Sequence, residues 1–267
     1  HSDETQDFFV GAFSLSEWGI WYYRFEGEFA NGDLAFFGRG LDGIAVRGDW
    51  LPEWQLTVTK CDYKTPNWAK QGVTYQIFAD RFCKVGDKPF TKKGRLHGDW
   101  YERPDIAEDG RDYRADDFFG GNLAGIEEKL DYLYDLGARV LYLNPIFEAV
   151  SNHRYNTADY ERIDPLLGTN EDFSALCRAA NARGMRVILD GVFSHTGNIS
   201  RYFNADGRFP DRGAAQGEDS PYYEWYSFTH FPDRYECWWG DRSLPNVREE
   251  MPSYRQYILG ENGIVRR

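Results

Sequence analysis

The sequence predicts an α/β fold built on a parallel sheet and preceded by a small all-β unit. Two junctions carry this prediction, because Gly137 to Leu141 and Gly184 to Ile188 share one pattern, a helix-stopping glycine followed by an arginine and an apolar strand. Alternating β/α units produce such a repeat. The length of 267 residues suits one large domain with a smaller companion. From these residues alone, an open doubly wound sheet and a (β/α)8 barrel both fit.

The N-terminal unit, which we assign to residues 1–62, shows short apolar runs separated by turn residues such as Asn31-Gly32-Asp33. The segment Gly38 to Gly43 matches the G-x-G-x-x-G pattern of dinucleotide sites. Because Gly48 and Pro52 follow it instead of a helical period, we reject a dinucleotide site. The expected strands are Gly19 to Phe25, Leu34 to Phe37 and Gln55 to Thr59.

The remainder of the chain alternates strands and helices. Apolar residues at helical spacing follow Asn122, which can cap a helix, and Gly137 ends that helix. A capping-box-like pattern at Thr169 starts a second helix, which Gly184 closes. Residues 190–252 are irregular, and loops that long are usually functional or form a subdomain. The other expected elements are strands Val73 to Phe78, Val140 to Leu143 and Val187 to Leu189, and a helix over Ser253 to Val265.

Composition restricts the ligand classes. The 31 basic and 43 acidic residues give a net charge of −12, which argues against nucleic acid as a partner. The longest apolar runs, such as Val187 to Phe193, are far too short to span a bilayer, so we expect no membrane partner. Aromatic residues make up 17% of the chain, and rings combined with carboxylates suit a sugar, although a ring-rich core is the alternative.

The 4 cysteines are scattered, without a C-x-x-C pair or zinc-ligand spacing. We therefore expect ordinary thiols. We favour a cytoplasmic location and keep secretion open, because an even number of cysteines also permits disulfides. Oligomeric state is not predicted.

Polar residues directly after apolar strands are the first candidates for a site, because ligands meet the carboxyl ends of parallel strands. Asp80, Asn144 and Asp190 occupy such positions. A charged Asp190 at the end of an apolar strand needs a partner, unless it serves only to cap a helix or fix a loop. Ser194 and His195 suggest a hydrolase triad with Asp190, but no G-x-S-x-G elbow is present and we reject it.

The chain resembles the α-amylase superfamily of glycoside hydrolases, especially its neopullulanase, cyclomaltodextrinase and amylopullulanase branch. The resemblance spans about Pro66 to Arg267. It rests on five ordered blocks, Tyr75 to Phe82, Gly120 to Ile126, Leu143 to Ala149, Ser151 to Tyr160 and Asp190 to His195.

The resemblance implies a partial (β/α)8 barrel with a protruding subdomain after its third strand. Residues 63–195 and 251–267 would form the first three β/α units, and residues 196–250 the protruding domain. Residues 1–62 resemble the C-terminal part of a β-sandwich domain of the carbohydrate-binding type. The chain then looks like a fragment that ends after the third barrel strand.

The resemblance also implies roles for individual residues. Asp190 would hold an active-site arginine and His195 would hydrogen-bond the sugar in the cleaved subsite. The ring of Tyr155 would stack under the same sugar, which favours a flattened oxocarbenium-like transition state. The residues expected to contact substrate are Tyr155, His195, Asn152, His153 and Trp239, with simple packing as the alternative for Trp239.

Two departures from the family pattern concern metal binding. Ser194 stands where the family usually has Asn, and Asn122 stands where it has Asp. Both changes remove oxygen ligands or charge near places where relatives bind calcium, so we doubt a Ca²⁺ site and expect no required cofactor. A cluster of acidic residues could still hold a cation, although we favour a solvated acidic loop as its interpretation. The cluster consists of Glu108, Asp109, Asp112, Asp116 and Asp117.

The expected activity is retaining cleavage of α-1,4 and also α-1,6 glucosidic bonds in α-glucans such as starch, maltooligosaccharides, pullulan or cyclodextrin. In this family the nucleophile and the acid/base follow the fourth and fifth strands. We therefore expect both beyond Arg267, and expect the printed chain to be inactive alone. The alternatives are a non-catalytic carbohydrate-binding relative of the same fold and an unrelated β/α metabolic enzyme.

Overall fold

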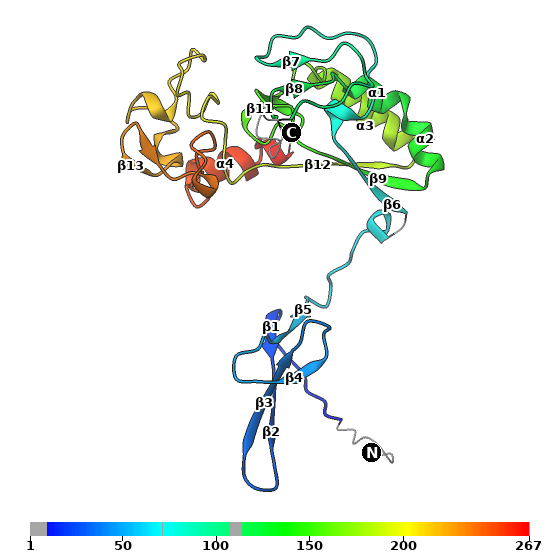
Figure 1. The fold of residues 1–267 in the computed structure, drawn as a ribbon, viewed down its shortest axis with the longest axis vertical. Coiled ribbons are helices and arrows are strands. Elements are labelled where there is room, and N and C mark those ends of the chain that lie inside the picture. The colour runs from blue at the N-terminus through cyan, green and yellow to red at the C-terminus, as the bar shows by residue number, and fades with distance from the viewer. Residues whose placement is uncertain (1–9, 71, 107–113, 267) are drawn as a thin grey trace. The chain divides into compact units, whose positions relative to one another are not determined.

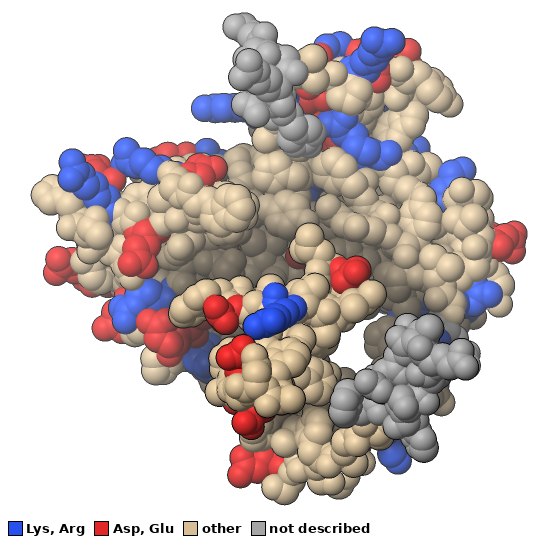
Figure 2. All heavy atoms as spheres, turned by 60° about the horizontal axis from the view of Figure 1, so that its bottom comes forward, with Lys and Arg blue, Asp and Glu red and all other residues tan. Residues whose placement is uncertain are grey.

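The computed structural model describes residues 10–70, 72–106 and 114–266. It divides into two compact units, His1–Pro66 and Asn67–Arg267, so the division falls close to the boundary predicted after residue 62. Figure 1 traces the chain through both units. On the face drawn in Figure 2, acidic and basic side chains of the described residues are interspersed among uncharged ones.

The first unit consists of two small antiparallel sheets, β1-β5 and β2-β3-β4. The predicted strand from Gly19 to Phe25 is split at Arg24 into β1 and β2, β2 runs on to Glu28, and the strand β4 was not predicted. Ala35 is the one buried apolar residue in the described part of this unit, so a sandwich remnant stays a prediction. The strands are β1 (Gly19–Tyr23), β2 (Phe25–Glu28), β3 (Leu34–Arg39), β4 (Ala45–Arg47) and β5 (Trp54–Val58).

The second unit is built on a parallel sheet in the order β12-β9-β6. These strands are β6 (Val73–Ile77), β9 (Ala138–Leu143) and β12 (Arg186–Leu189), close to the predicted positions. Leu141 in the central strand lies opposite Tyr75 on one side and Val187 on the other. Each strand of this sheet thus pairs with the sheet strand that follows it along the chain, as β/α units in series require.

The helices of the β/α units begin where capping residues predict. The Asn122 side chain accepts a hydrogen bond from the Gly125 backbone at the start of α1 (Leu123–Glu128), and α2 (Leu130–Asp135) continues it after a break at Lys129. Thr169 and Asp172 form a complete capping box on α3 (Asn170–Ala182). Because α1 and α3 contact one another, both lie on the same side of the sheet (Figure 1).

The last helix, α4 (Pro252–Leu259), is shorter than the predicted Ser253 to Val265. It ends at Gly260, and a separate 3₁₀ turn follows. The 3₁₀ helices are η1 (Asn67–Lys70), η2 (Ala79–Arg81), η3 (Ala214–Gln216), η4 (Tyr223–Trp225), η5 (Trp238–Gly240) and η6 (Ile264–Arg266).

Several short strands in the connections were not predicted. They are β7 (Arg95–Leu96), β8 (Asp117–Phe118), β10 (Phe147–Ala149), β11 (Thr157–Ile163), β13 (Phe228–His230) and β14 (Arg234–Tyr235). The hairpin of β10 and β11 has two register irregularities. Such irregularities interrupt the alternation of apolar and polar residues by which a strand is predicted. It brackets the loop that carries the predicted sugar-contacting residues.

Two apolar clusters hold this unit together. One joins the parallel strands to α1, α2 and α3 through aliphatic residues such as Leu123, Leu141 and Leu176. The other is rich in aromatic residues and joins α4 to the irregular segment 196–250, with Tyr202 and Trp225 buried in it. Some aromatic residues, such as Tyr202 and Trp225, are therefore core, whereas others, such as Trp50 and Trp239, are exposed, so neither interpretation of the composition accounts for all of them.

Candidate functional site

The carboxyl ends of the three parallel strands meet at one edge of the sheet. The backbone ladder extends one residue further, because the amide of Asn144 donates to the carbonyl of Ile77 and that of Asp190 to the carbonyl of Leu143, both at 3.0 Å. An open pocket of about 360 Å³ lies at this edge, lined by Gln76, Phe78, Asn144 and His153.

A series of polar side chains crosses this edge and ends on Asp190. The Tyr155 hydroxyl donates to Asp190 Oδ2 at 2.9 Å, and the Asn144 amide donates to the Tyr155 hydroxyl at 3.5 Å. Gln76 in turn donates to Asn144 Oδ1 at 2.8 Å. The predicted residues Asp190, Tyr155 and Asn144 are therefore brought together. No role was predicted for Gln76, although a polar residue inside an apolar strand was an available signal.

Tyr155 is held as a neutral hydrogen-bond donor. Burial and the carboxylate of Asp190 raise its pKa to about 12, so the hydroxyl keeps its proton at neutral pH. Burial and Asp190 also raise the pKa of Tyr142 on the central strand. Two phenols thus lie near the Asp190 carboxylate.

His153 lines the pocket and lies beside Tyr155. Their rings are stacked with centroids 5.8 Å apart, and the Tyr155 amide donates to His153 Nδ1 at 3.1 Å. Burial, reinforced by the Arg154 guanidinium, lowers the pKa of His153 to about 4. The imidazole is therefore neutral at physiological pH and can accept a hydrogen bond.

Arg154 anchors the loop between these two rings. Its φ of 62° lies in the left-handed region, which is strained for a residue of this size, and its side chain is 1% exposed. The guanidinium lies 3.1 Å from Asp164 and donates to the Asn152 carbonyl at 2.6 Å. Lys92 reaches the same carboxylate at 2.7 Å. A sequence pattern does not reveal this anchor, because Asp164 lies ten residues further along the chain.

The predicted contact residue Asn152 has a buried side chain. Its amide donates to the carbonyls of Arg114 at 3.0 Å and Asp117 at 2.6 Å. These bonds tie the loop to the strand β8. The geometry gives Asn152 a role in positioning its neighbours, and a direct sugar contact stays a prediction.

His195 is buried, and its ring faces the backbone of Tyr155. Burial lowers its pKa, so the ring is neutral at pH 7. Its ring centroid is 5.7 Å from that of Trp238, on which the predicted contact residue Trp239 is stacked. Ser194 Oγ lies 3.3 Å from His195 Nδ1, but Asp190 bonds Tyr155 instead, so these three residues form no triad.

Asn122 and Asp116, two residues that the sequence singled out in connection with calcium, make hydrogen bonds or ion pairs within the protein. The Asn122 side chain accepts from the Gly125 amide and donates to the Val85 carbonyl, both at 2.9 Å, so neither end of its amide is free. Asp116 is paired with Arg114 at 2.9 Å. Glu108, Asp109 and Asp112 lie outside the described residues. The side chains of Asn122 and Asp116 thus already have protein partners, and the expectation that no Ca²⁺ is required stays a prediction.

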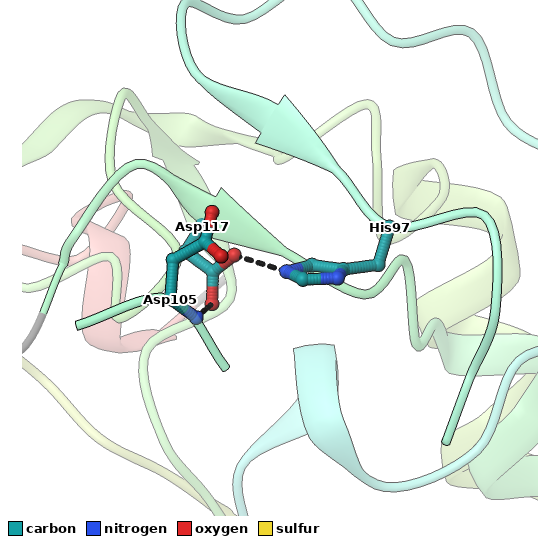
Figure 3. A group of neighbouring side chains, drawn as sticks. All are labelled: His97, Asp105 and Asp117. Carbon is teal, nitrogen blue, oxygen red and sulfur yellow. Dashed lines mark hydrogen bonds and ion pairs between the residues drawn. The ribbon is translucent and has the colours of Figure 1, made fainter. Parts of the chain in front are cut away.

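Figure 3 shows another group with metal-ligand chemistry, His97, Asp105 and Asp117, whose ligand atoms lie within 4.8 Å of one another. Asp117 is buried, so the prediction of a solvated acidic loop is wrong for this residue. His97 Nε2 contacts its carboxylate, Arg81 lies 3.2 Å from it, and Arg95 holds Asp105 at 2.9 Å. Arginine side chains already balance the negative charge of both carboxylates, and a metal ion would have to displace them.

The fold is that of a parallel β/α protein, and the candidate ligand site lies at the carboxyl ends of its strands. The family model of the α-amylase catalytic domain matches residues 76–257. The chain therefore belongs to the α-amylase family.

Individual relatives agree with this assignment. The chain is 39% identical to an amylopullulanase of Thermoanaerobacterium saccharolyticum, over 92% of this chain and 21% of the relative. The solved type III pullulan hydrolase of Thermococcus kodakarensis is similar with a TM-score of 0.60 and 30% identity, over 84% of this chain and 41% of that one. The solved cyclic α-maltosyl-(1→6)-maltose hydrolase of Arthrobacter globiformis is similar with a TM-score of 0.57 and 34% identity. This similarity covers 73% of this chain and 41% of that one.

Some predictions about the chain are tested by these findings and by the structure. The chain spans about a fifth of the amylopullulanase, which it resembles over most of its own length. The four cysteines are unpaired. Among the described residues, none of the helices has the length and apolar character needed to cross a membrane.

Proposed function

We propose that the pocket at the sheet edge is the substrate-binding part of the active site of an α-glucan-cleaving glycosidase. The observation that carries this is the Tyr155–Asp190 hydrogen bond at the carboxyl ends of the strands, 2.9 Å long. It places an aromatic ring and a carboxylate side by side, and a pyranose offers an apolar C–H face and hydroxyl groups to such a pair. The names of the relatives, an amylopullulanase and a pullulan hydrolase, support α-glucans as the substrate class.

The proposed reaction is retaining hydrolysis of α-1,4 and also α-1,6 glucosidic bonds. It needs two carboxyl groups roughly 5 Å apart, one as nucleophile and one as acid/base. Asp190 is a carboxylate at this edge, and Tyr155 already engages it. We assign Asp190 to holding a cationic group of the complete site, and assign the nucleophile and the acid/base to residues outside this chain. The printed chain should then bind glucan without cleaving it.

His195 and His153 are assigned to hydrogen bonds with sugar hydroxyls. Both rings are neutral at pH 7, because burial lowers both pKa values. A neutral imidazole can donate from one nitrogen and accept at the other, as a hydroxyl partner requires. The Nε2 of His195 is buried and has no hydrogen-bond partner among the described residues.

The test is binding of maltoheptaose to the 267-residue chain by titration calorimetry, with cellohexaose as the β-linked control. We expect binding of the α-linked sugar only, weakened by Tyr155→Ala and unchanged by Tyr132→Ala, which removes an exposed ring on α2. Equal binding of both sugars, or none, would refute an α-glucan site. The alternative, a non-catalytic carbohydrate-binding relative, predicts the same binding but no turnover in any longer protein that contains this chain.

A further inference from the structure

We infer that Gln76 and Asn144 are positioning residues, which aim the hydroxyl group of Tyr155 at the carboxylate of Asp190. The inference rests on the proposed function, because it concerns how the same pocket is arranged for the sugar. The two amides act through Tyr155 and need no contact with the substrate. The observation behind this is a chain of three hydrogen bonds that crosses the carboxyl edge of the sheet in one direction.

The register of the sheet carries both amides to one face. Gln76 in β6 lies opposite Tyr142 in β9. Asn144 follows Tyr142 by two residues, and side chains two residues apart along a strand point to the same face. The backbone amide of Asn144 donates to the Ile77 carbonyl at 3.0 Å, which extends the pairing of the two strands as far as Asn144. Paired backbones therefore set the distance between the two side chains.

The hydrogen bonds of this chain have a fixed sense. Gln76 Nε2 donates to Asn144 Oδ1 at 2.8 Å, so the other end of the Asn144 amide, Nδ2, faces Tyr155. Nδ2 donates to the Tyr155 hydroxyl at 3.5 Å, and this hydroxyl donates to Asp190 Oδ2 at 2.9 Å. A phenol has a single proton to donate. Because its oxygen accepts from Asn144, that proton is directed to Asp190.

The orientation of the Asn144 amide depends on Gln76. Without the Gln76 donor, the amide can turn by half a rotation in the same volume and present Oδ1 to Tyr155. The hydroxyl can then donate to Asn144 instead of Asp190. In the intact chain each hydrogen bond also polarises the next, which strengthens the bond on Asp190. A carboxylate fixed at one oxygen offers a defined geometry to the cationic group that it is assigned to hold.

Two other roles for these amides compete with positioning. A structural role has little support, because Gln76 is exposed, Asn144 is half-buried, and neither belongs to the apolar clusters. A direct contact with substrate is the stronger competitor, because both residues line the pocket. The experiment must therefore separate an action through the Tyr155 hydroxyl from an action on the sugar.

The experiment is a double-mutant cycle in an active protein that contains this chain, with kcat/KM for maltooligosaccharides as the readout. Gln76→Met keeps the length of the side chain and removes its donor. We expect this change to lower kcat/KM about fivefold in the parent, the effect of one neutral hydrogen bond. In a Tyr155→Phe background the loss should be less than about twofold, because the hydroxyl that Gln76 directs is absent. Asn144→Ala should behave in the same way.

The matched control is Gln55→Met in the N-terminal unit. Gln55 is also exposed on a strand, and its Nε2 donates to Thr57 Oγ1 at 3.2 Å, so the same change removes a similar hydrogen bond. This control should leave kcat/KM unchanged. Melting temperatures of all variants should stay within about 4 °C of the parent, since each loses about one hydrogen bond.

The outcomes separate the inference from the proposed function. Equal losses from Gln76→Met in the parent and in Tyr155→Phe would overturn the inference, because Gln76 would then act on the sugar or on the fold. Unchanged kcat/KM in Gln76→Met, while Tyr155→Phe loses activity, would also refute it and leave the proposed function intact. If Tyr155→Phe and Tyr155→Ala both keep normal turnover, the proposed site itself is wrong.

Discussion

Replacement of Tyr155 tests the centre of the proposed site. Tyr155→Ala removes a hydroxyl that donates to Asp190 at 2.9 Å and a ring that stacks beside His153 with centroids 5.8 Å apart. A hydrogen bond to a charged group contributes about 1.5 kcal/mol, and an aromatic stacking contact about 1.2 kcal/mol. If the hydroxyl and the ring of Tyr155 make contacts of this size with the sugar in the transition state, their loss of about 2.7 kcal/mol lowers kcat/KM about a hundredfold.

The two contributions can be separated. Tyr155→Phe keeps the ring and loses only the hydroxyl, so we expect roughly a tenfold loss of kcat/KM. The assay is hydrolysis of maltooligosaccharides by an active protein that contains this chain, with Tyr132→Ala as the control on the exposed face of α2. Tyr155 is only half-buried, so melting temperatures should change little. Near-normal turnover by Tyr155→Ala would refute the assignment of the subsite.

Three further predictions concern the stability of the site. Asp164→Asn should destabilise the chain by about 3–5 kcal/mol in urea unfolding, because it leaves Arg154 and Lys92 buried without their shared carboxylate, and an unchanged midpoint would contradict this. The folded pKa of His153, about 4, lies below its unfolded value near 6.5, so its stabilising contribution is complete above pH 6.5 and lost as the pH falls toward 4. The melting temperature should therefore fall from pH 6.5 to 5, and less so in His153→Gln. EDTA should leave the melting temperature unchanged, because Asn122 bonds the backbone where a metal would bind, and a drop reversed by calcium would disprove this.

The sequence by itself determined the features that depend on neighbouring residues. The cap at Asn122 and the capping box at Thr169 predicted where α1 and α3 begin, because a cap needs only side chains within one turn of the helix, and Gly137 and Gly184 predicted where the helices end. Apolar runs likewise predicted the three parallel strands. The ordered blocks of residues predicted the family, which the match over residues 76–257 confirms.

The tertiary structure alone decided the features that depend on distant partners. Tyr155 meets Asp190 across 35 residues, and Arg154 adopts its left-handed backbone because Asp164 and the Asn152 carbonyl hold its side chain. Asp117 looked like part of a solvated acidic loop, yet Arg81 and His97 pair with it in the interior. The free energy of a buried charge depends on which opposite charge folding brings next to it, and no local pattern encodes that distance.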